Sequence, residues 1–143
     1  MTHPKLHARI DASFVRQGMM QHLGARIVAV APGKVEVALP YSERVTQQQG
    51  GYHGGAMGAL ADIAAGYAGL TVAPEGQEVT TVEYKINFLA AFQGGELRAR
   101  GHVVRVGKRL IITTAEVVHL DDDGGESPCA LMQQTLATVN KTY

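Results

Sequence analysis

The sequence has 143 residues and a mass of 15.2 kDa, which suits one compact domain and leaves little room for a second. Thirteen Lys and Arg residues balance thirteen Asp and Glu residues, so no global field would attract nucleic acid or an anionic membrane. Only 18% of the residues are charged, against about 25% in an average domain. A small monomer needs more charge than this to cover its surface, so we expect a homo-oligomer that buries part of it.

The single cysteine, Cys129, excludes an intramolecular disulfide framework and a cysteine-based zinc site, as a reducing compartment would allow. The N-terminal sequence lacks the apolar core of an export signal, and we expect a cytoplasmic protein. Residues 56–73 are nearly apolar, but they are mostly Ala and Gly and carry Asp62 near their centre. A central Asp costs about 3 kcal/mol on membrane-insertion scales, so this segment is predicted to be a buried helix and no membrane partner is expected.

The chain is expected to be one domain, residues 1–143, in which residues 1–10 form a flexible N-terminal segment. Apolar residues recur at helical spacing in residues 11–23, which predicts a short amphipathic helix that ends at Gly24. Residues 25–40 then alternate apolar and polar positions on both sides of a Pro-Gly turn signal. This pattern predicts a first hairpin.

Residues 41–52 are polar and contain glycines, which predicts a loop that leads into the 56–73 helix. Downstream of the helix, four segments with a period of two are separated by turn signals. These predicted strands are residues 81–88, 97–106, 110–120 and 129–139. About six strands joined mostly by tight turns favour an antiparallel sheet.

A helix that is apolar on every side must be covered on every side. The predicted sheet can curl around it, and a second copy of the chain can supply the remaining cover. The expected architecture is therefore α+β, with one long buried helix between the first hairpin and a four-stranded meander.

Residues 47–62 join a glycine-rich loop to the N-terminus of the predicted helix. Backbone N–H groups at a helix N-terminus have no intrahelical partner and lie at the positive end of the helix dipole. Gly54 and Gly55 lack a Cβ atom, so a carbonyl that develops negative charge could approach these amides as in an oxyanion hole. The spacing favours equally a purely structural role, in which the glycines let the helix begin against crowded backbone.

Asp62 is the sharper candidate, because an ionised carboxylate in an apolar helix costs several kcal/mol unless it is paired or solvated. The alternative is a structural carboxylate that bonds a nearby hydroxyl or amide. His53 lies nine residues earlier, on the opposite side of the helix and about 13 Å away along its axis, so the two side chains cannot meet. If both belong to one site, Asp62 of one chain must face the Gly54 end of another chain around a two-fold axis.

Other candidates carry weaker signals. The remaining histidines show no metal-ligand spacing, so no metal site is expected. Lys108 and Arg109 follow Gly107 in a predicted turn, which is usually a solvated feature of a hairpin. Two cations at an exposed turn could also hold a phosphate group.

Taken together, the chain resembles hotdog-fold acyl-CoA thioesterases of the PaaI-like type. The resemblance rests on His53-Gly54-Gly55, on the carboxylate nine residues after that histidine, and on the patterns of residues 81–89 and 100–109. It covers roughly residues 20–140. It implies a hotdog fold, in which a long central helix is wrapped by a curved antiparallel sheet, and homodimers or homotetramers with shared active sites.

The resemblance also implies roles for individual residues. The Gly54 amide would polarise a thioester carbonyl, and Asp62 of the partner chain would act as general base or nucleophile. Gln47 would orient the water or the carbonyl, and Thr81 would position the water beside Asp62. Strand alternation alone disagrees on one point, because it puts Thr80 rather than Thr81 on the apolar face of the strand.

Two positions depart from the family pattern. Gln47 stands where many relatives have Asn, and the residues after Phe88-Leu89 lack the usual proline, a change that would affect the acyl pocket.

The leading functional hypothesis is hydrolysis of a small or medium-chain acyl-CoA or an aryl-CoA thioester to the free acid and CoA, with no metal or redox cofactor. The expected catalytic set also includes His53. The expected substrate-binding residues are Gly55, Arg105, Lys108 and Arg109. Two alternatives are a hydroxyacyl-thioester dehydratase and an acyl-CoA-binding protein without turnover. The buried charge of Asp62 argues against the second, because a mere binding protein gains nothing from it.

Overall fold

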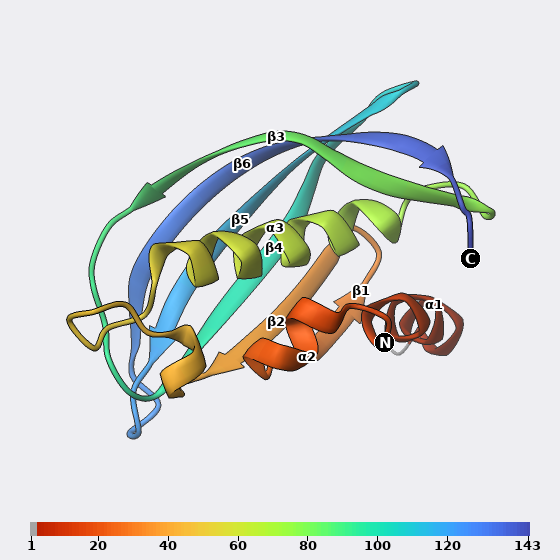
Figure 1. The fold of residues 1–143 in the computed structure, drawn as a ribbon. Helices are drawn as coiled ribbons and strands as arrows, with labels where there is room; N and C mark the ends of the chain where they lie inside the picture. The colour runs from red at the N-terminus through yellow and green to blue at the C-terminus, as the bar shows by residue number, and fades with distance from the viewer. Residues whose placement is uncertain (1–2) are drawn as a thin grey trace.

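Figure 1 shows a computed structural model that describes residues 3–143. Two short helices, α1 (Pro4–Phe14) and α2 (Gly18–Leu23), precede a hairpin, and a 3-10 turn, η1 (Glu43–Val45), leads to the long helix α3 (Gly54–Leu70). The six strands are β1 (Arg26–Ala31), β2 (Lys34–Pro40), β3 (Gln77–Phe88), β4 (Glu96–Val106), β5 (Leu110–Leu120) and β6 (Glu126–Asn140).

The strands form one curved antiparallel sheet that wraps around α3 (Figure 1). This confirms the predicted α+β hotdog architecture with a long central helix. The strand order is β1-β2-β4-β5-β6-β3, so the expected four-stranded meander is wrong. Seven residues, rather than a tight turn, connect β3 to β4, and this length lets β3 pair with β6 at the far edge while β4 pairs with β2.

Small side chains let α3 lie close against the sheet. Four alanines of the helix are fully buried: Ala61, Ala64, Ala65 and Ala68. On the sheet side, a Cβ atom at Gly101 would stand 2.3 Å from the backbone oxygen of Ala64. Only glycine fits at this crossing. The small side chains of α3 and Gly101 of β4 together allow the helix and the sheet to pack closely.

The N-terminal region differs from its prediction. Residues 4–10 belong to α1 instead of forming a flexible segment, because Pro4 suits the first turn of a helix and Ile10 and Phe14 pack into the core one turn apart. The predicted helix over 11–23 is interrupted, and α2 begins only at Gly18. Residues 1–2 of the expected flexible segment lie outside the described part of the chain.

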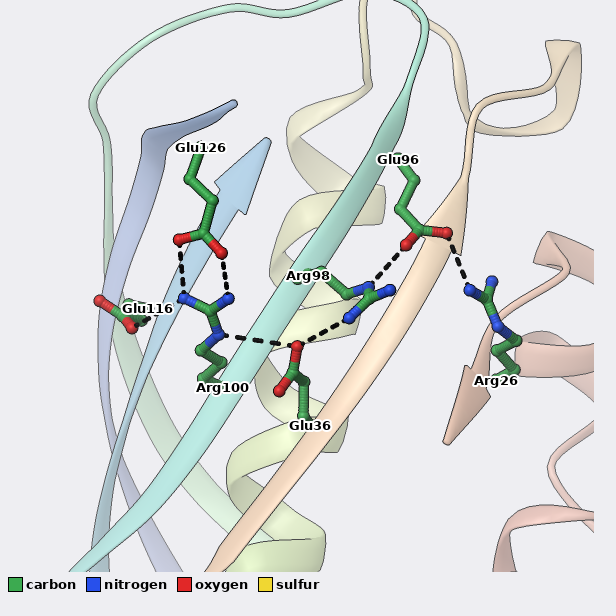
Figure 2. Close-up of polar contacts among 7 residues, drawn as sticks. All are labelled: Arg26, Glu36, Glu96, Arg98, Arg100, Glu116 and Glu126. Atoms are coloured by element: carbon green, nitrogen blue, oxygen red, sulfur yellow. Dashed lines mark hydrogen bonds and ion pairs between the residues drawn. The ribbon is translucent and has the colours of Figure 1, made fainter. Parts of the chain in front are cut away.

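Charged side chains pair on the face of the sheet that points away from α3 (Figure 2). Arg98 binds Glu96 at 2.6 Å and Glu36 at 3.0 Å, and Arg26 binds the other oxygen of Glu96 at 3.0 Å. Arg100 continues the network to the glutamates Glu36, Glu116 and Glu126. Within residues 3–143, no helix is long and apolar enough to cross a membrane.

Candidate active site

Asp62 lies in the middle of α3 and finds its partners on two strands. Thr81 of β3 donates its hydroxyl hydrogen to Asp62 Oδ1 at 2.7 Å, and Nε2 of Gln134 on β6 donates to the same oxygen. The other oxygen, Oδ2, accepts no hydrogen bond from any residue that the structure describes. One oxygen of the carboxylate is therefore anchored, while the second is available for chemistry.

The environment of Asp62 makes it a stronger base than an ordinary surface carboxylate. Partial burial raises the pKa of Asp62, and the hydrogen bonds from Thr81 and Gln134 oppose that rise. The balance remains on the raised side. A carboxylate with a raised pKa accepts a proton from water more readily near neutral pH.

Sequence reasoning missed Gln134, whose side chain is 1% exposed. Thr113 of β5 donates its hydroxyl hydrogen to Gln134 Oε1 at 2.8 Å, which turns Nε2 toward Asp62. A polar residue between the buried Met132 and Leu136, at an inward position of β6, was the available signal. Only pairing between distant strands brings this signal to Asp62.

A β-bulge explains why Thr81, and not Thr80, reaches the carboxylate. The register between β3 and β6 shifts between Thr81 and Glu83, so Val82 is an extra residue on β3. The bulge reverses the alternation, and Val82 is 59% exposed instead of lying on the predicted apolar face. Thr81, the residue that the family pattern indicated, therefore lies beside Asp62, whereas simple alternation indicated Thr80.

At the start of α3, His53 acts as the N-cap. Its Nδ1 accepts a hydrogen bond from the Gly55 N–H at 2.7 Å. We expected Gly55 to bind substrate, but its amide is already bonded within the chain. The Gly54 N–H makes no hydrogen bond within residues 3–143 and remains a free donor. A Cβ atom at Gly54 would also stand 3.2 Å from the Phe88 ring, so the glycine has a packing role as well.

Gln47 organises the loop before α3. Its backbone N–H donates to Gly51 at 2.9 Å, its backbone oxygen accepts from Gly50 at 2.9 Å, and its Oε1 accepts from the backbone N–H of Gln49. Its Nε2 donates to no residue in the described chain. The loop therefore holds Gln47 with a side-chain donor still free.

A cavity of about 500 Å³ opens beside Asp62 between α3 and β3. Asp62 and Thr81 line it, whereas Gln47 and Gly54 do not. Gly54 lies eight residues before Asp62 on α3, about 12 Å along the helix axis. The single chain thus presents the carboxylate and the free amide as two separate halves of a site.

The three candidate phosphate-binding cations lie at the β4–β5 hairpin. Arg105, Lys108 and Arg109 are exposed, and none of them forms an ion pair within residues 3–143, in contrast to the arginines in Figure 2. The backbone oxygen of Arg109 accepts from Thr138 of β6 at 3.3 Å. The same part of β6 contains Leu136, which lines the cavity.

The described residues contain no group of three or more His, Cys, Asp and Glu side chains that could hold a metal ion.

Comparisons with known proteins agree with this geometry. The family model of the thioesterase superfamily matches residues 49–126, more than half of the chain. The 1,4-dihydroxy-2-naphthoyl-CoA hydrolase of Listeria monocytogenes is 33% identical over 124 residues, which are 87% of this chain and 98% of that protein.

Solved structures point the same way. A thioesterase family protein from Silicibacter pomeroyi superimposes with a TM-score of 0.90 and 38% identity, covering 95% of this chain and 99% of that one. The PaaI protein of E. coli has the same fold, with a TM-score of 0.84, 23% identity and 96% of each chain covered. These comparisons confirm the predicted hotdog fold and the resemblance to PaaI-like proteins. They also confirm, at the level of the family, the predicted enzyme class, thioester hydrolase. The helix, the sheet that wraps it and the matched sequence together make this chain a member of the thioesterase superfamily.

Proposed function

We propose that the protein hydrolyses a small or medium-chain acyl-CoA or an aryl-CoA thioester to the free acid and CoA. The observation that carries this proposal is Asp62, whose Oδ1 is anchored by two donors while Oδ2 remains free beside a cavity of about 500 Å³. Cavities of this size suit small organic ligands. The name of the Listeria relative, which describes hydrolysis of an aromatic CoA thioester, supports the aryl branch of the proposal.

In the proposed reaction, Asp62 Oδ2 takes a proton from a water molecule whose oxygen attacks the thioester carbon. The bond between carbon and sulfur then breaks, and CoA leaves as a thiolate that takes up a proton. As an alternative, Oδ2 attacks the carbon directly, the bond between carbon and sulfur breaks and CoA leaves as a thiolate that takes up a proton. Water then hydrolyses the resulting anhydride to the free acid and the Asp62 carboxylate. Both routes use the side chains of this fold and require no metal or redox cofactor.

The developing oxyanion would bind the free Gly54 N–H at the positive end of α3. Gln47, whose Nε2 is free, would donate to the same carbonyl or to the attacking water. Thr81 would act through Asp62, because its hydroxyl hydrogen is already donated to Oδ1. His53 would keep the Gly55 amide engaged and so help to orient the Gly54 amide beside it.

We further propose a homodimer as the minimal active unit, since Gly54 and Asp62 of one chain are about 12 Å apart along the helix. Strand β3 is an edge of the sheet and carries exposed apolar side chains. These include Val82, Tyr84 and Phe88, and Leu89 follows directly after the strand; all four are at least 44% exposed. Two copies related by a two-fold axis would cover this surface and bring each Asp62 to the Gly54 end of the other α3.

Arg105, Lys108 and Arg109 are proposed to bind the phosphates of CoA. They supply unpaired positive charge in a protein whose formal net charge is zero. Such a local cluster is what a substrate with several phosphates requires.

The test is a thiol-release assay on a panel of CoA thioesters with the wild type and Asp62→Asn. Asparagine retains an oxygen that can accept from both Thr81 and Gln134, so the variant should fold while losing its basicity. Its kcat should fall by about 10²–10⁴, the usual loss when a general base is removed. Asp122→Asn, an exposed carboxylate in the β5–β6 turn, is the matched control and should retain wild-type turnover.

The outcome separates the alternatives as well. A dehydratase would remove water from a hydroxyacyl thioester and release no thiol. A binding protein would bind the thioester and leave it unchanged. Wild-type activity in a folded Asp62→Asn variant would show that the carboxylate is structural.

A further inference from the structure

The turn that carries Gln47 is closed by hydrogen bonds among its own atoms. The Gly50 N–H donates to the Gln47 carbonyl oxygen at 2.9 Å, and the Gln47 N–H donates to the Gly51 carbonyl oxygen at 2.9 Å. The Gln49 N–H donates to Oε1 of Gln47. All three bonds join residues 47–51 to one another, so by themselves they do not fix the turn relative to the sheet.

One hydrogen bond reaches this turn from outside. Tyr41 follows directly after β2, and its hydroxyl donates to the Gly50 carbonyl oxygen at 2.5 Å. In the part of the chain that the structure describes, no other hydrogen bond joins residues 47–51 to the rest of the protein. Tyr41 therefore connects the turn to the end of β2.

Tyr41 is itself held by the segment that leads into β4. Its backbone N–H donates to the Gly95 carbonyl oxygen at 3.1 Å, and its ring packs edge-on against Tyr52 with the ring centroids 5.3 Å apart. Tyr52 is buried, and its hydroxyl donates to the carbonyl oxygens of Gly94 at 3.0 Å and Gly95 at 3.2 Å. These contacts fix the position of the Tyr41 ring and hence of its hydroxyl.

The direction of the Gln47 side chain depends on the position of the whole turn, because its Oε1 is bonded to a backbone N–H of that turn. Its Nε2 lies beside Gly51, where an added Cβ atom would stand 3.3 Å from Nε2 and 3.1 Å from the Phe92 carbonyl oxygen. A shift of the turn would therefore move the free Nε2 donor with it.

We propose that Tyr41 is a positioning residue for thioester hydrolysis, which fixes the turn through Gly50 and so holds Gln47 Nε2 where it donates to the thioester carbonyl or the attacking water. The inference rests on the proposed function and assigns a residue that touches no reacting atom. A donor to a carbonyl that gains negative charge acts mainly in the transition state, so its displacement lowers kcat more than it raises KM.

The test measures kcat and KM with the CoA thioester that the wild type hydrolyses fastest, in Tyr41→Phe, Gln47→Ala and the double variant. Phenylalanine keeps the ring against Tyr52 and removes only the hydroxyl. Tyr41→Phe should lower kcat about tenfold and leave KM within about threefold of its wild-type value. In the Gln47→Ala background the same substitution should change kcat by less than about twofold, because the group that Tyr41 positions is already absent.

Thr46→Val is the matched control. It removes a hydroxyl that also donates to a backbone carbonyl oxygen, that of Glu43 at 2.8 Å, just before the turn, and it should retain wild-type kcat. Wild-type kcat in Tyr41→Phe, or an equal loss in the two Gln47 backgrounds, would overturn the inference and leave the proposed hydrolase intact. A loss in Thr46→Val as large as in Tyr41→Phe would overturn it as well.

A second readout does not depend on turnover. Hydrogen exchange of the Gln49 and Gly50 amides, followed by NMR, should be about tenfold faster in Tyr41→Phe, because their acceptors belong to the turn that the hydroxyl holds. The Tyr52 amide, which donates to Phe92 at 3.0 Å, should exchange as in the wild type. Unchanged exchange at Gln49 and Gly50 would overturn the inference. If no CoA thioester releases thiol, the proposed function fails, while the exchange rates still decide whether Tyr41 fixes the turn.

Discussion

Gln134 of β6 donates its side-chain N–H to Asp62 Oδ1 of α3, across a sequence separation of 72 residues. Its amide is oriented by Thr113 of β5, which donates to Oε1. The carboxylate is thus held by a buried network that crosses three elements, and only its Oδ2 faces an open position.

Gln134→Met should shift the acid limb of the pH–activity profile to higher pH. The amide N–H stabilises the ionised carboxylate, so its loss leaves burial less opposed and raises the pKa of Asp62 further. The base is active when ionised, and a higher pKa therefore requires a higher pH for full activity. The measurement is kcat/KM against pH, which reports the free enzyme.

Thr113→Val combined with Gln134→Met is the companion variant, because it removes the hydroxyl that would otherwise lose its buried acceptor. An unchanged acid limb in this folded double variant would mean that Gln134 does not influence the ionisation of Asp62.

Asp62→Asn should be more stable than the wild type at neutral pH. The pKa of Asp62 is raised in the folded state above the 3.8 of a free carboxyl, so the folded protein binds the proton more tightly than the unfolded chain. Wild-type stability relative to the variant should therefore fall as the pH rises from the unfolded pKa through the folded one. Thermal unfolding of both proteins across this range, at one fixed protein concentration, measures the difference. A gap that widens on acidification would contradict the expected sign.

Mixed dimers should recover activity if the site is shared. Asp62→Asn removes the base, and Gly54→Val crowds the Phe88 ring next to the free amide, so each variant alone should be nearly inactive. Random reassembly of equal amounts should restore about a quarter of wild-type activity, because half of the dimers then contain one intact site. Light scattering should show dimers or larger assemblies. A monomer, or a mixture without recovery, would contradict the shared site.

His53→Ala should lower the free energy of unfolding by about 1 kcal/mol through loss of the N-cap of α3. His53→Asn, which can also cap, should retain most of this stability. Urea unfolding of the three proteins measures the effect. Equal losses for Ala and Asn would show that the bond from Gly55 to the histidine ring contributes little.

Arg109→Ala should raise KM for CoA thioesters severalfold and change kcat little, because a phosphate contact remote from the reacting carbon binds substrate and transition state alike. Lys34→Ala removes an exposed cation from the first position of β2 and serves as the charge-matched control. A large fall in kcat at constant KM would place Arg109 in a different role.

Local sequence patterns determined much of the secondary structure of this protein and identified one candidate site residue. The alternation in residues 25–40 predicted the first hairpin, and the uniformly apolar run after residue 55 predicted the buried helix, because both depend on short-range periodicity. Asp62 stood out for the same reason, as a charge where the local pattern allows none.

The tertiary structure decided what surrounds that charge. Strand order places β3 beside β6 rather than β4, and a bulge at Val82 turns Thr81 toward α3. Gln134 comes from yet another strand, far along the chain. These pairings depend on which strands meet across long separations, and periodicity within a segment carries no information about its neighbour in the sheet.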